Sequence, residues 1–421
     1  MRSDHDRRDA RTPAGPPPGR PQVGPQPARA ATPLISPSLA NQVNRARVLQ
    51  SLYDIGPLSR SDLARLTGTT RAAIGTIVQP MIDSGILAEG DPRSSGAAGG
   101  KPARPLWFSP AGPSIAAVHL LPGLVDVALV SAAGEILATA NGRFRPDGPD
   151  PDEVIETLLG CLARVLPTGG TPPMGVGIAV GGIVDTDTGT VMKVNLAPVL
   201  DGLPLGRLLS RRLDLPVYLD HHPRVQALGD RWFGQARGVQ SFASLYLADA
   251  LGVGLVIDGA VQRGQAGAGG EIGHTVVELD GRVCECGQRG CWETIATDRW
   301  LRDEAVRLGL PAAPSMTTGS LARLAARNHP GAADLLDRFA RNISVGIINL
   351  QQILAPGLFI LHGNAIAGGD TFRRRIEAHV QSRILQPAAG PPQIVFAEAG
   401  DHVTELGAAG LVLSHTLRLI A

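Results

Sequence analysis

The sequence predicts an α/β protein in which a small helical domain precedes a larger body made of two α/β lobes. After a Pro-rich start, apolar residues between 41 and 88 recur at helical spacing, with short turns between the segments. From residue 109 onward strand patterns alternate with helical ones, and a second set repeats the first. We therefore expect a two-lobed body over 109–421, with lobes at about 109–225 and 226–400 and a last helix at 401–417.

Length and composition exclude several classes of protein. The 421 residues exceed what one core usually holds, and 43% hydrophobic with 18% charged residues is typical of a globular chain. No apolar run approaches the roughly 18 residues of a membrane span, and the first residues lack the apolar region of a signal peptide. Four cysteines are too few for a disulfide scaffold. These features predict a cytoplasmic protein.

Charge is unevenly distributed along the chain. Residues 1–105 carry 14 Lys and Arg against 8 Asp and Glu, whereas the remainder carries 25 against 30. A basic N-terminal part followed by an acidic remainder indicates an N-terminal domain that binds a polyanion. A solvated basic tail would give the same distribution of charge and is the alternative. Residues 1–38 are rich in Pro, Arg and Gly and poor in apolar side chains. We expect them to form a disordered arm.

Residues 39–108 have the pattern of a winged helix-turn-helix. A helix that starts near Asn41 ends at Gly56-Pro57, Ser59–Asp62 resembles a capping box, and Gly68 supplies the turn before a third helix. Two short strand patterns follow, separated by a basic, Gly-rich loop at 96–104. Helix, turn, helix and hairpin in this order indicate DNA binding, and a plain three-helix packing domain is the alternative.

The third helix is the expected recognition helix. Its exposed face carries small or hydrogen-bonding side chains suited to a groove, and the wing adds basic residues for phosphate. Pro80 lies within this helix and predicts a kink or a shortened helix there. The residues that we expect to contact DNA are Ser59, Arg60, Thr69, Thr70, Arg71, Thr76, Lys101 and Arg104.

A cysteine cluster predicts a structural zinc site. Three of the four cysteines fall within eight residues, and a histidine precedes them by ten positions. One imidazole and three thiolates are the usual ligands of a closed tetrahedral zinc, although a set of reduced thiols without metal is the alternative. The expected ligands are His274, Cys284, Cys286 and Cys291.

The same region carries a family resemblance. The segment from Glu271 to His274 (EIGH), followed by C-x-C-G-x-x-G-C-x-E from Cys284 to Glu293, resembles the signature of the ROK family (repressor, open reading frame, kinase). The resemblance extends from residue 41 almost to the end, through NRARVL, SRSDLARLTG, GIAVGGIVDTDTG and ELGAAGLVL. It implies a sugar kinase/actin-like body that binds sugar between its lobes, with zinc bracing the sugar-contacting segment.

The resemblance also indicates that this chain is no kinase. Phosphoryl transfer needs phosphate-binding loops and a base. The family's D-x-G-G-T-K loop corresponds to the segment that starts at His119, and its G-T-G-x-G-G-G loop to Ala248–Gly254. Its third Gly-rich loop corresponds to His362–Asn364, and its catalytic Asn-Asp pair to His221-His222. All four depart from the family pattern, so we expect no catalytic residue.

The sugar-binding positions are better preserved. Asn195, Glu271, His274 and Glu293 match positions where the family contacts sugar hydroxyls, and we expect His222 to lie in the same cleft. Paired donors and acceptors suit a sugar ring. The alternative is that these residues are retained from the family fold although no ligand binds to them.

Together these features predict a sequence-specific transcriptional regulator, most simply a repressor of carbohydrate-related genes. Its expected partners are double-stranded operator DNA, a sugar or sugar phosphate, and further copies of itself in a homodimer or homotetramer. Pro102, Pro105 and Pro110 predict a stiff connection between head and body. The alternatives are an ATP-dependent ROK sugar kinase with an extra domain, and a regulator whose body only oligomerises.

Overall fold

The computed structural model describes residues 37–91, 103–169, 171–267, 269–385, 390–398 and 402–416. Most of the expected disordered arm, most of the wing loop and Lys101 lie outside these residues. The chain divides into two units, Met1–Ala40 and Asn41–Ala421, and the second holds nearly all described elements.

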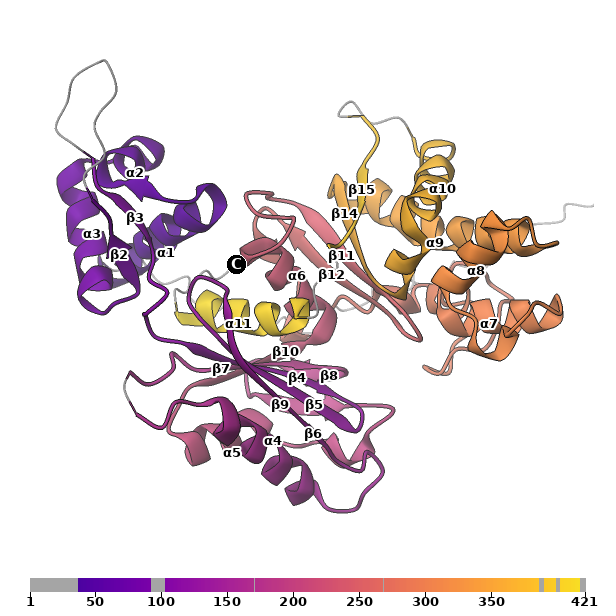
Figure 1. Ribbon diagram of the computed structural model, residues 1–421, viewed down its shortest axis with the longest axis horizontal. Helices are drawn as coiled ribbons and strands as arrows, with labels where there is room; N and C mark the ends of the chain where they lie inside the picture. The colour runs from indigo at the N-terminus through magenta and orange to yellow at the C-terminus, as the bar shows by residue number, and fades with distance from the viewer. Residues whose placement is uncertain are drawn as a thin grey trace, which may run out of the picture. The chain divides into compact units, whose positions relative to one another are not determined.

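The head has the three helices and the small sheet that the sequence predicts (Figure 1). Its helices are α1 (Pro37–Ile55), α2 (Arg60–Thr67) and α3 (Arg71–Asp83). Its sheet has the order β1-β3-β2, with β1 (Leu58–Ser59), β2 (Leu87–Glu89) and β3 (Pro105–Phe108). Ile74, Val78 and Met81 of α3 are buried at the predicted helical spacing. The arrangement is a winged helix-turn-helix.

Pro80 does not shorten α3, contrary to one of the two sequence expectations. The helix continues to Asp83, and the amide of Ser84 donates to the carbonyl of Pro80 over 3.1 Å. Pro80 has no N–H to donate to the carbonyl of Thr76. Both residues are exposed, so water can hydrogen-bond to that carbonyl and the helix continues.

The body contains two five-stranded sheets with the same construction. Each begins with an antiparallel meander of three strands and adds two parallel strands beside the first of them. In the first lobe the order is β10-β7-β4-β5-β6, built from β4 (Ile115–Leu121), β5 (Leu124–Val130), β6 (Ile136–Arg143), β7 (Val176–Val180) and β10 (Val217–His221). In the second it is β13-β12-β11-β14-β15, built from β11 (Phe242–Leu247), β12 (Leu251–Ile257), β13 (Ala260–Val261), β14 (Leu358–Gly363) and β15 (Gln393–Phe396). The duplicated, two-lobed α/β body is confirmed.

Helices and one hairpin complete the lobes. The helices are α4 (Pro151–Val165), α5 (Leu205–Leu213), α6 (His222–Trp232), α7 (Asp298–Arg307), α8 (Thr318–Ala326), α9 (Ala332–Leu354), α10 (Gly369–Gln381) and α11 (Val403–Thr416). The hairpin consists of β8 (Ile183–Asp185) and β9 (Thr190–Lys193).

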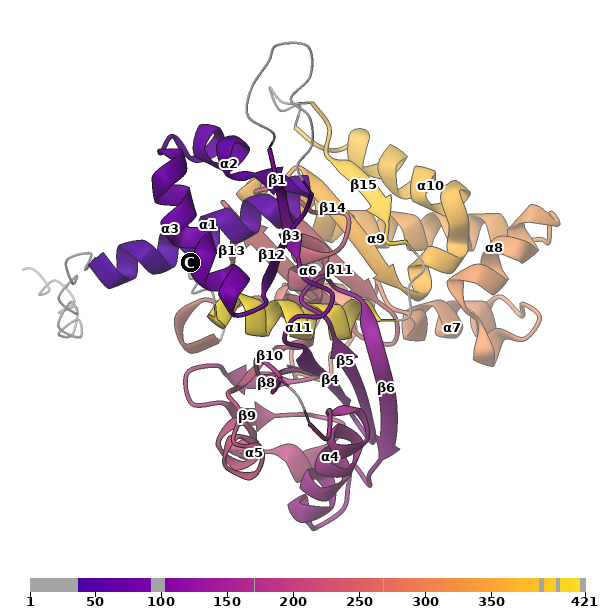
Figure 2. The same ribbon diagram turned by 60° about the vertical axis from the view of Figure 1, so that its left-hand side comes forward.

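Helices α6 and α11 pack against each other at the centre of the body, and both views show them side by side (Figures 1 and 2). Every residue of α6 is buried. The two backbones approach closely because the contact is made by glycines. A Cβ on Gly407 would lie 2.0 Å from the carbonyl oxygen of Val225, and one on Gly229 would lie 2.6 Å from that of Val403. Helix α11 also packs on β4 and β7, so the last helix completes the first lobe.

The head contacts the body directly through the end of α1. The Tyr53 ring is buried against Phe108 of the head and packs edge-on against Trp232 and Phe233, with ring centroids 4.7 and 5.6 Å away. Its hydroxyl donates to the carbonyl of Ala132. One hydrophobic core therefore includes residues of the head and of both lobes.

Polar contacts reinforce this junction. Arg237 donates through Nε to the carbonyl of Tyr53 over 2.9 Å, and the amide of Gly238 donates to Asp54 Oδ1 over 3.0 Å. Pro105 belongs to β3. The predicted stiff connection was to contain Pro102, Pro105 and Pro110. Because Pro105 is part of the head's sheet, only the residues after Phe108 link the head to the body. Among the described helices, none is long and apolar enough to cross a membrane.

Replacing Gly407 by alanine tests the α6–α11 contact. The added methyl group meets backbone rather than a movable side chain, so we expect Gly407→Ala to lower the free energy of unfolding by about 1–3 kcal/mol. Gly160→Ala is the matched control, because Gly160 is exposed on α4 and a Cβ there would meet no atom within 4 Å. It should be neutral or stabilising by about 0.5–1 kcal/mol. Equal urea midpoints for the two variants would contradict the close contact.

Candidate functional site

A cavity of about 230 Å³ lies between the two lobes. The first lobe contributes the ends of β7 and β10 and the segment after β9, and the second lobe contributes the β11–β12 turn and residues 270–274. The volume falls below the roughly 300–1,000 Å³ of pockets for drug-sized ligands, so the cavity suits a small ligand.

All five residues expected at the ligand site border this cavity. Asn195 follows β9 and His222 begins α6. Glu271 precedes a single 3₁₀ turn that ends at His274, and Glu293 lies just after the cysteine cluster. These residues are up to about a hundred positions apart in sequence, and the fold places them around one space. Carboxylate, amide and imidazole groups in such a ring can bind several hydroxyl groups of one small molecule.

Glu271 is held by a histidine that sequence analysis assigned to no ligand role. Nδ1 of His221 lies 3.5 Å from Oε1 of Glu271, and His221 also lines the cavity. Burial lowers the pKa of His221, and the Glu271 carboxylate partly opposes this shift. The neutral imidazole can therefore hydrogen-bond to Glu271 and still leave one ring nitrogen for a ligand.

A buried ion-pair cluster lies directly behind His221. Asp220 is fully buried and pairs with Nε of Arg224 at 3.0 Å and with Nε of Arg263 at 2.7 Å. Arg224 also donates to the carbonyl of Gly267 over 2.9 Å. The carboxylate thus joins the end of β10 to the loop that leads to Glu271, which fixes one wall of the cavity.

The His274 and cysteine side chains come together as one potential metal site. One ligand atom from each of His274, Cys284, Cys286 and Cys291 lies within 4.8 Å of all the others. Nδ1 of His274 is 3.5 Å from Sγ of Cys284, and Sγ of Cys286 is 3.6 Å from Sγ of Cys291. These are the donors that the sequence predicts, and together they can bind a metal ion.

The cysteines converge because the chain forms a tight knuckle. The amide of Cys284 donates to the carbonyl of Gln288 over 2.7 Å, and the amide of Gly287 donates to the carbonyl of Cys284 over 2.9 Å. Gly290 has φ +72, and a Cβ there would lie 1.5 Å from the carbonyl oxygen of Glu278. Only glycine can occupy this position.

The thiol pKa values differ within the cluster. Burial raises the pKa of Cys291 to about 12 and also raises that of Cys284, whereas a backbone hydrogen bond from Gln288 lowers that of the exposed Cys286. The buried thiols therefore hold their protons at neutral pH. A metal ion must displace these protons, so its binding weakens as pH falls.

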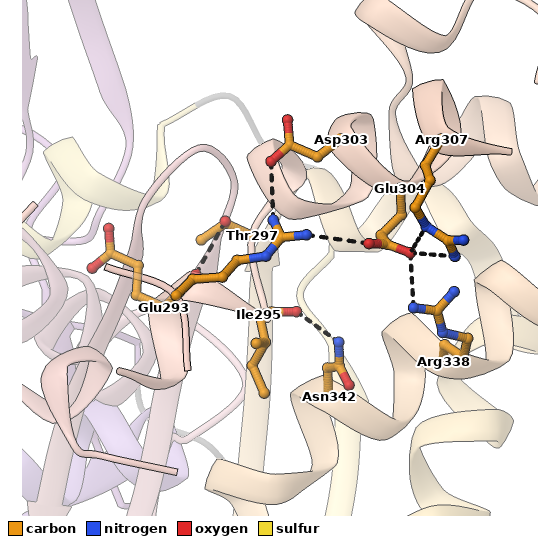
Figure 3. Close-up of polar contacts among 9 residues, drawn as sticks. Glu293, Ile295, Thr297, Asp303, Glu304, Arg307, Arg338 and Asn342 are labelled. Carbon is orange, nitrogen blue, oxygen red and sulfur yellow. Dashed lines mark hydrogen bonds and ion pairs between the residues drawn. The ribbon is translucent and has the colours of Figure 1, made fainter. Parts of the chain in front are cut away.

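Hydrogen bonds of the residues before and after Glu293 fix the position of its backbone. Nε1 of the preceding Trp292 donates to the carbonyl of Asn342 over 2.9 Å, and Nδ2 of Asn342 donates to the carbonyl of Ile295 over 2.9 Å. Thr297 donates to the carbonyl of Glu293 (Figure 3). The Glu293 carboxylate points away from these contacts (Figure 3) and lies 3.8 Å from His274 Nδ1. Burial raises its pKa, and His274 partly opposes the shift.

His222 forms the floor of the cavity and belongs to a chain of polar contacts. Its Nδ1 lies 3.4 Å from Nε2 of His119, its Nε2 lies 3.4 Å from Oγ1 of Thr404, and its ring packs against Tyr246. Burial lowers the pKa of His222 well below the usual value, and the neighbouring histidines add to the shift. His222 is therefore a neutral residue tied to the first lobe and to α11.

The other segments that the family resemblance matches to phosphate loops make local contacts. Nε2 of His362 lies 2.8 Å from Asp230 Oδ2, and Nδ2 of Asn364 donates to Asp298 Oδ2 over 2.6 Å. Asp249 is exposed at the β11–β12 turn and pairs with Arg302.

The predicted DNA-contacting residues divide into two groups. Thr69, Thr70, Arg71, Thr76 and Arg104 are exposed, and Thr70 also caps α3 by accepting from the amide of Ala73 over 3.2 Å. Thr70, Arg71 and Thr76 are therefore presented to solvent by the first half of α3 and its cap, and Arg104 is presented just before β3. Lys101 lies outside the described residues.

Ser59 and Arg60 are engaged inside the head. Ser59 is buried and forms a reciprocal capping box with Asp62 at the start of α2. Arg60 forms an ion pair with Glu89 of β2. Their sequence positions predict DNA contacts. In the structure, Ser59 caps the start of α2 and Arg60 links α2 to the wing sheet. Their contact with DNA stays a prediction.

Some residues that line the cavity were not anticipated. His221, Tyr246 and Glu285 border it, and they lie on three separate segments. Glu285 stands between the first two cysteines of the knuckle, but nothing in that spacing indicates a ligand contact. Only His221 offered a signal, since it adjoins His222 at the end of a predicted strand.

The model of the ROK family matches residues 124–415. The chain belongs to the ROK family. A putative xylose repressor from Caldicellulosiruptor sp. (strain Rt8B.4) is 27% identical over 398 residues, which cover 90% of this chain and 98% of that protein.

Solved structures agree with this assignment. A ROK family transcriptional regulator, a homologue of the Escherichia coli MLC protein, aligns with a TM-score of 0.74 at 24% identity over 90% of this chain and 98% of its own. A ROK family glucokinase from Streptomyces griseus, solved with glucose and AMPPNP, aligns with a TM-score of 0.60 at 25% identity over 71% of this chain and 98% of its own. The regulator is thus similar to most of this chain, and the kinase to a smaller part.

Proposed function

We propose that this ROK protein is a DNA-binding transcriptional repressor that a sugar releases from its operator. The observation that carries the proposal is the extent of the similarity to proteins named as repressors. It spans 90% of the chain and 98% of a putative xylose repressor. Since the chain combines a winged helix-turn-helix with a small polar cavity between the lobes, it has one element for DNA and one for an effector.

In this proposal the sugar lies among Asn195, His222, Glu271, His274 and Glu293. The two carboxylates accept hydrogen bonds from sugar hydroxyls, and Asn195 both donates and accepts. These residues belong to both lobes, so a bound sugar favours the arrangement in which the lobes lie closest to it. The name of the relative makes xylose the first effector to examine, and a sugar phosphate is the alternative.

The proposed metal is zinc, held by His274 and the three cysteines as a structural ion. Its donor set suits a closed tetrahedral site. Because Nδ1 of His274 faces Cys284, the ion fixes the orientation of the imidazole at the edge of the cavity. It also joins the segment that carries Glu271 to the one that carries Glu293.

We further propose that the protein does not transfer phosphate. Histidines stand at the positions that correspond to the family's first loop and catalytic pair, and burial leaves His222 neutral and tied to Thr404. His362 and Asn364 are engaged with Asp230 and Asp298, and Asp249 places a carboxylate where a phosphate would approach. Each feature disfavours nucleotide binding.

The proposed DNA surface is the start of α3 together with the wing. Arg71 is exposed in the first helical turn, where recognition helices contact base edges, and Arg104 is exposed beside β3. Self-assembly into a homodimer or homotetramer would pair two such heads on a pseudo-palindromic site.

Removing one thiolate tests the metal site. Protein purified without chelator should contain about one equivalent of zinc per chain by elemental analysis, and Cys286→Ser should lose it. Cys161→Ala is the control, because Cys161 is buried in α4 away from the cluster and should leave the zinc content unchanged. Wild-type protein without zinc would refute the site.

Substitutions in the head test DNA recognition on an operator selected from a random duplex library. Arg71→Ala should cost about 1–3 kcal/mol of specific binding and relax the preference at one operator position. Arg104→Ala should instead weaken binding to all sequences and reduce its salt dependence. Arg211→Ala, an exposed change on α5 of the body, should have no effect. Unchanged binding by both head variants would exclude this surface.

The effector response tests the proposed function itself. D-xylose and D-glucose are titrated into the protein–operator complex, and DNA release is followed by fluorescence anisotropy. Glu271→Gln should keep the DNA affinity but bind sugar about 10–100-fold more weakly, since a hydrogen bond to a charged group contributes about 1.5–3 kcal/mol. Asp280→Asn, an exposed change nearby, should respond as wild type. If DNA is released equally from Glu271→Gln, the sugar does not bind in this cavity.

A further inference from the structure

A second cluster of potential metal ligands lies in the first lobe, away from the cysteines. His119 on β4 and Asp126 on β5 are directly opposite each other in the antiparallel register, and Glu405 belongs to the first turn of α11. One ligand atom from each of the three lies within 4.8 Å of the others. Three separate elements therefore bring an imidazole and two carboxylates to one point.

Positive charge near the two carboxylates is limited: His402 and Arg143 favour the ionised form of Asp126, but less than burial opposes it. Glu405 is buried and Asp126 is half-buried, and burial raises the pKa of each carboxyl group. Within the described part of the chain, no side chain donates a hydrogen bond to either carboxylate. The nearest basic atom to Glu405 is Nδ1 of His402, 3.9 Å from Oε2, and this nitrogen is itself buried without a hydrogen-bond partner. Two adjacent carboxylates in such surroundings favour a bound cation or a shared proton.

We propose that His119, Asp126 and Glu405 form a second cation site that binds a divalent transition-metal ion such as Mn²⁺. One imidazole and two carboxylates are harder ligands than thiolates, and ligand softness separates the metals that each kind of site prefers. The cysteine cluster selects zinc, whereas this site accepts manganese. Because this site has no sulfur ligand, it can bind manganese, which a thiolate site disfavours.

The cation would stiffen the floor of the effector cavity. Nε2 of His119 faces Nδ1 of His222, and Nε2 of His222 faces Thr404, one residue before Glu405. A metal ion on His119 fixes the orientation of that ring, and through it the tautomer and position of His222. It also ties the start of α11 to the β4–β5 hairpin. In this role His222 is a positioning residue next to the ligand.

The test is a titration of the full chain with Mn²⁺ after removal of metals by chelator. Free Mn²⁺ is measured by electron paramagnetic resonance. We expect about one bound equivalent in the wild type, and at least tenfold weaker binding in Asp126→Asn and in Glu405→Gln. Asp147→Asn, an exposed carboxylate of the same lobe, should bind as wild type. Cys286→Ser should also retain Mn²⁺, which separates this site from the cysteine cluster.

Thermal unfolding distinguishes a variant that loses metal binding from one that fails to fold. Mn²⁺ should raise the melting temperature of the wild type and of Asp147→Asn but not that of Glu405→Gln. The metal-free Glu405→Gln protein should melt no lower than metal-free wild type, because the change removes a buried charge. The proposal is overturned if the wild type binds no Mn²⁺, or if both carboxylate variants bind it as tightly as the wild type.

Discussion

The close contact between α6 and α11 is the constraint on which the rest of the structure depends. Gly229 and Gly407 let the two backbones approach to a distance that any side chain would prevent. Helix α6 then passes fully buried from the cavity floor at His222 to Trp232 beneath the head. Helix α11 follows it from Thr404 to Ser414, which accepts a hydrogen bond from Nε1 of Trp232 over 3.0 Å. The cavity between the lobes therefore lies at one end of this packed pair of helices, and the head lies at the other.

Hydrophobic periodicity predicted most of the regular elements. The buried residues of α4 recur at helical spacing, and the repeated strand pattern agrees with the duplicated sheets. The elements that were missed are short or polar. Helices α5, α8 and α10 and the β8–β9 hairpin bury only a few side chains each, so their apolar pattern is weak. Strand β1 has two residues and forms only because β3 pairs with it.

The candidate site was predictable where a local motif carries it. The cysteine knuckle and the EIGH segment fix their own geometry through nearby glycines, and both contribute to the cavity wall. The His119–Asp126–Glu405 cluster has no such motif, since one member lies almost 300 residues from the others and only strand register and the return of α11 join them. Ser59 shows a second kind of limit, because its position predicts a DNA contact while its hydroxyl also caps α2, a role that the sequence pattern alone does not separate from the first.

The contact between Arg237 and the carbonyl of Tyr53 has a consequence for how such proteins diversify. Tyr53 lies in the last turn of α1, where helix carbonyls lack intrahelical donors, and the body supplies the missing donor. The aromatic ring of the same residue is buried in the body. The head is thus not a free-standing module. An exchange of heads between related regulators would keep this junction only if the incoming first helix ended with an aromatic ring against Trp232 and a free carbonyl at Arg237.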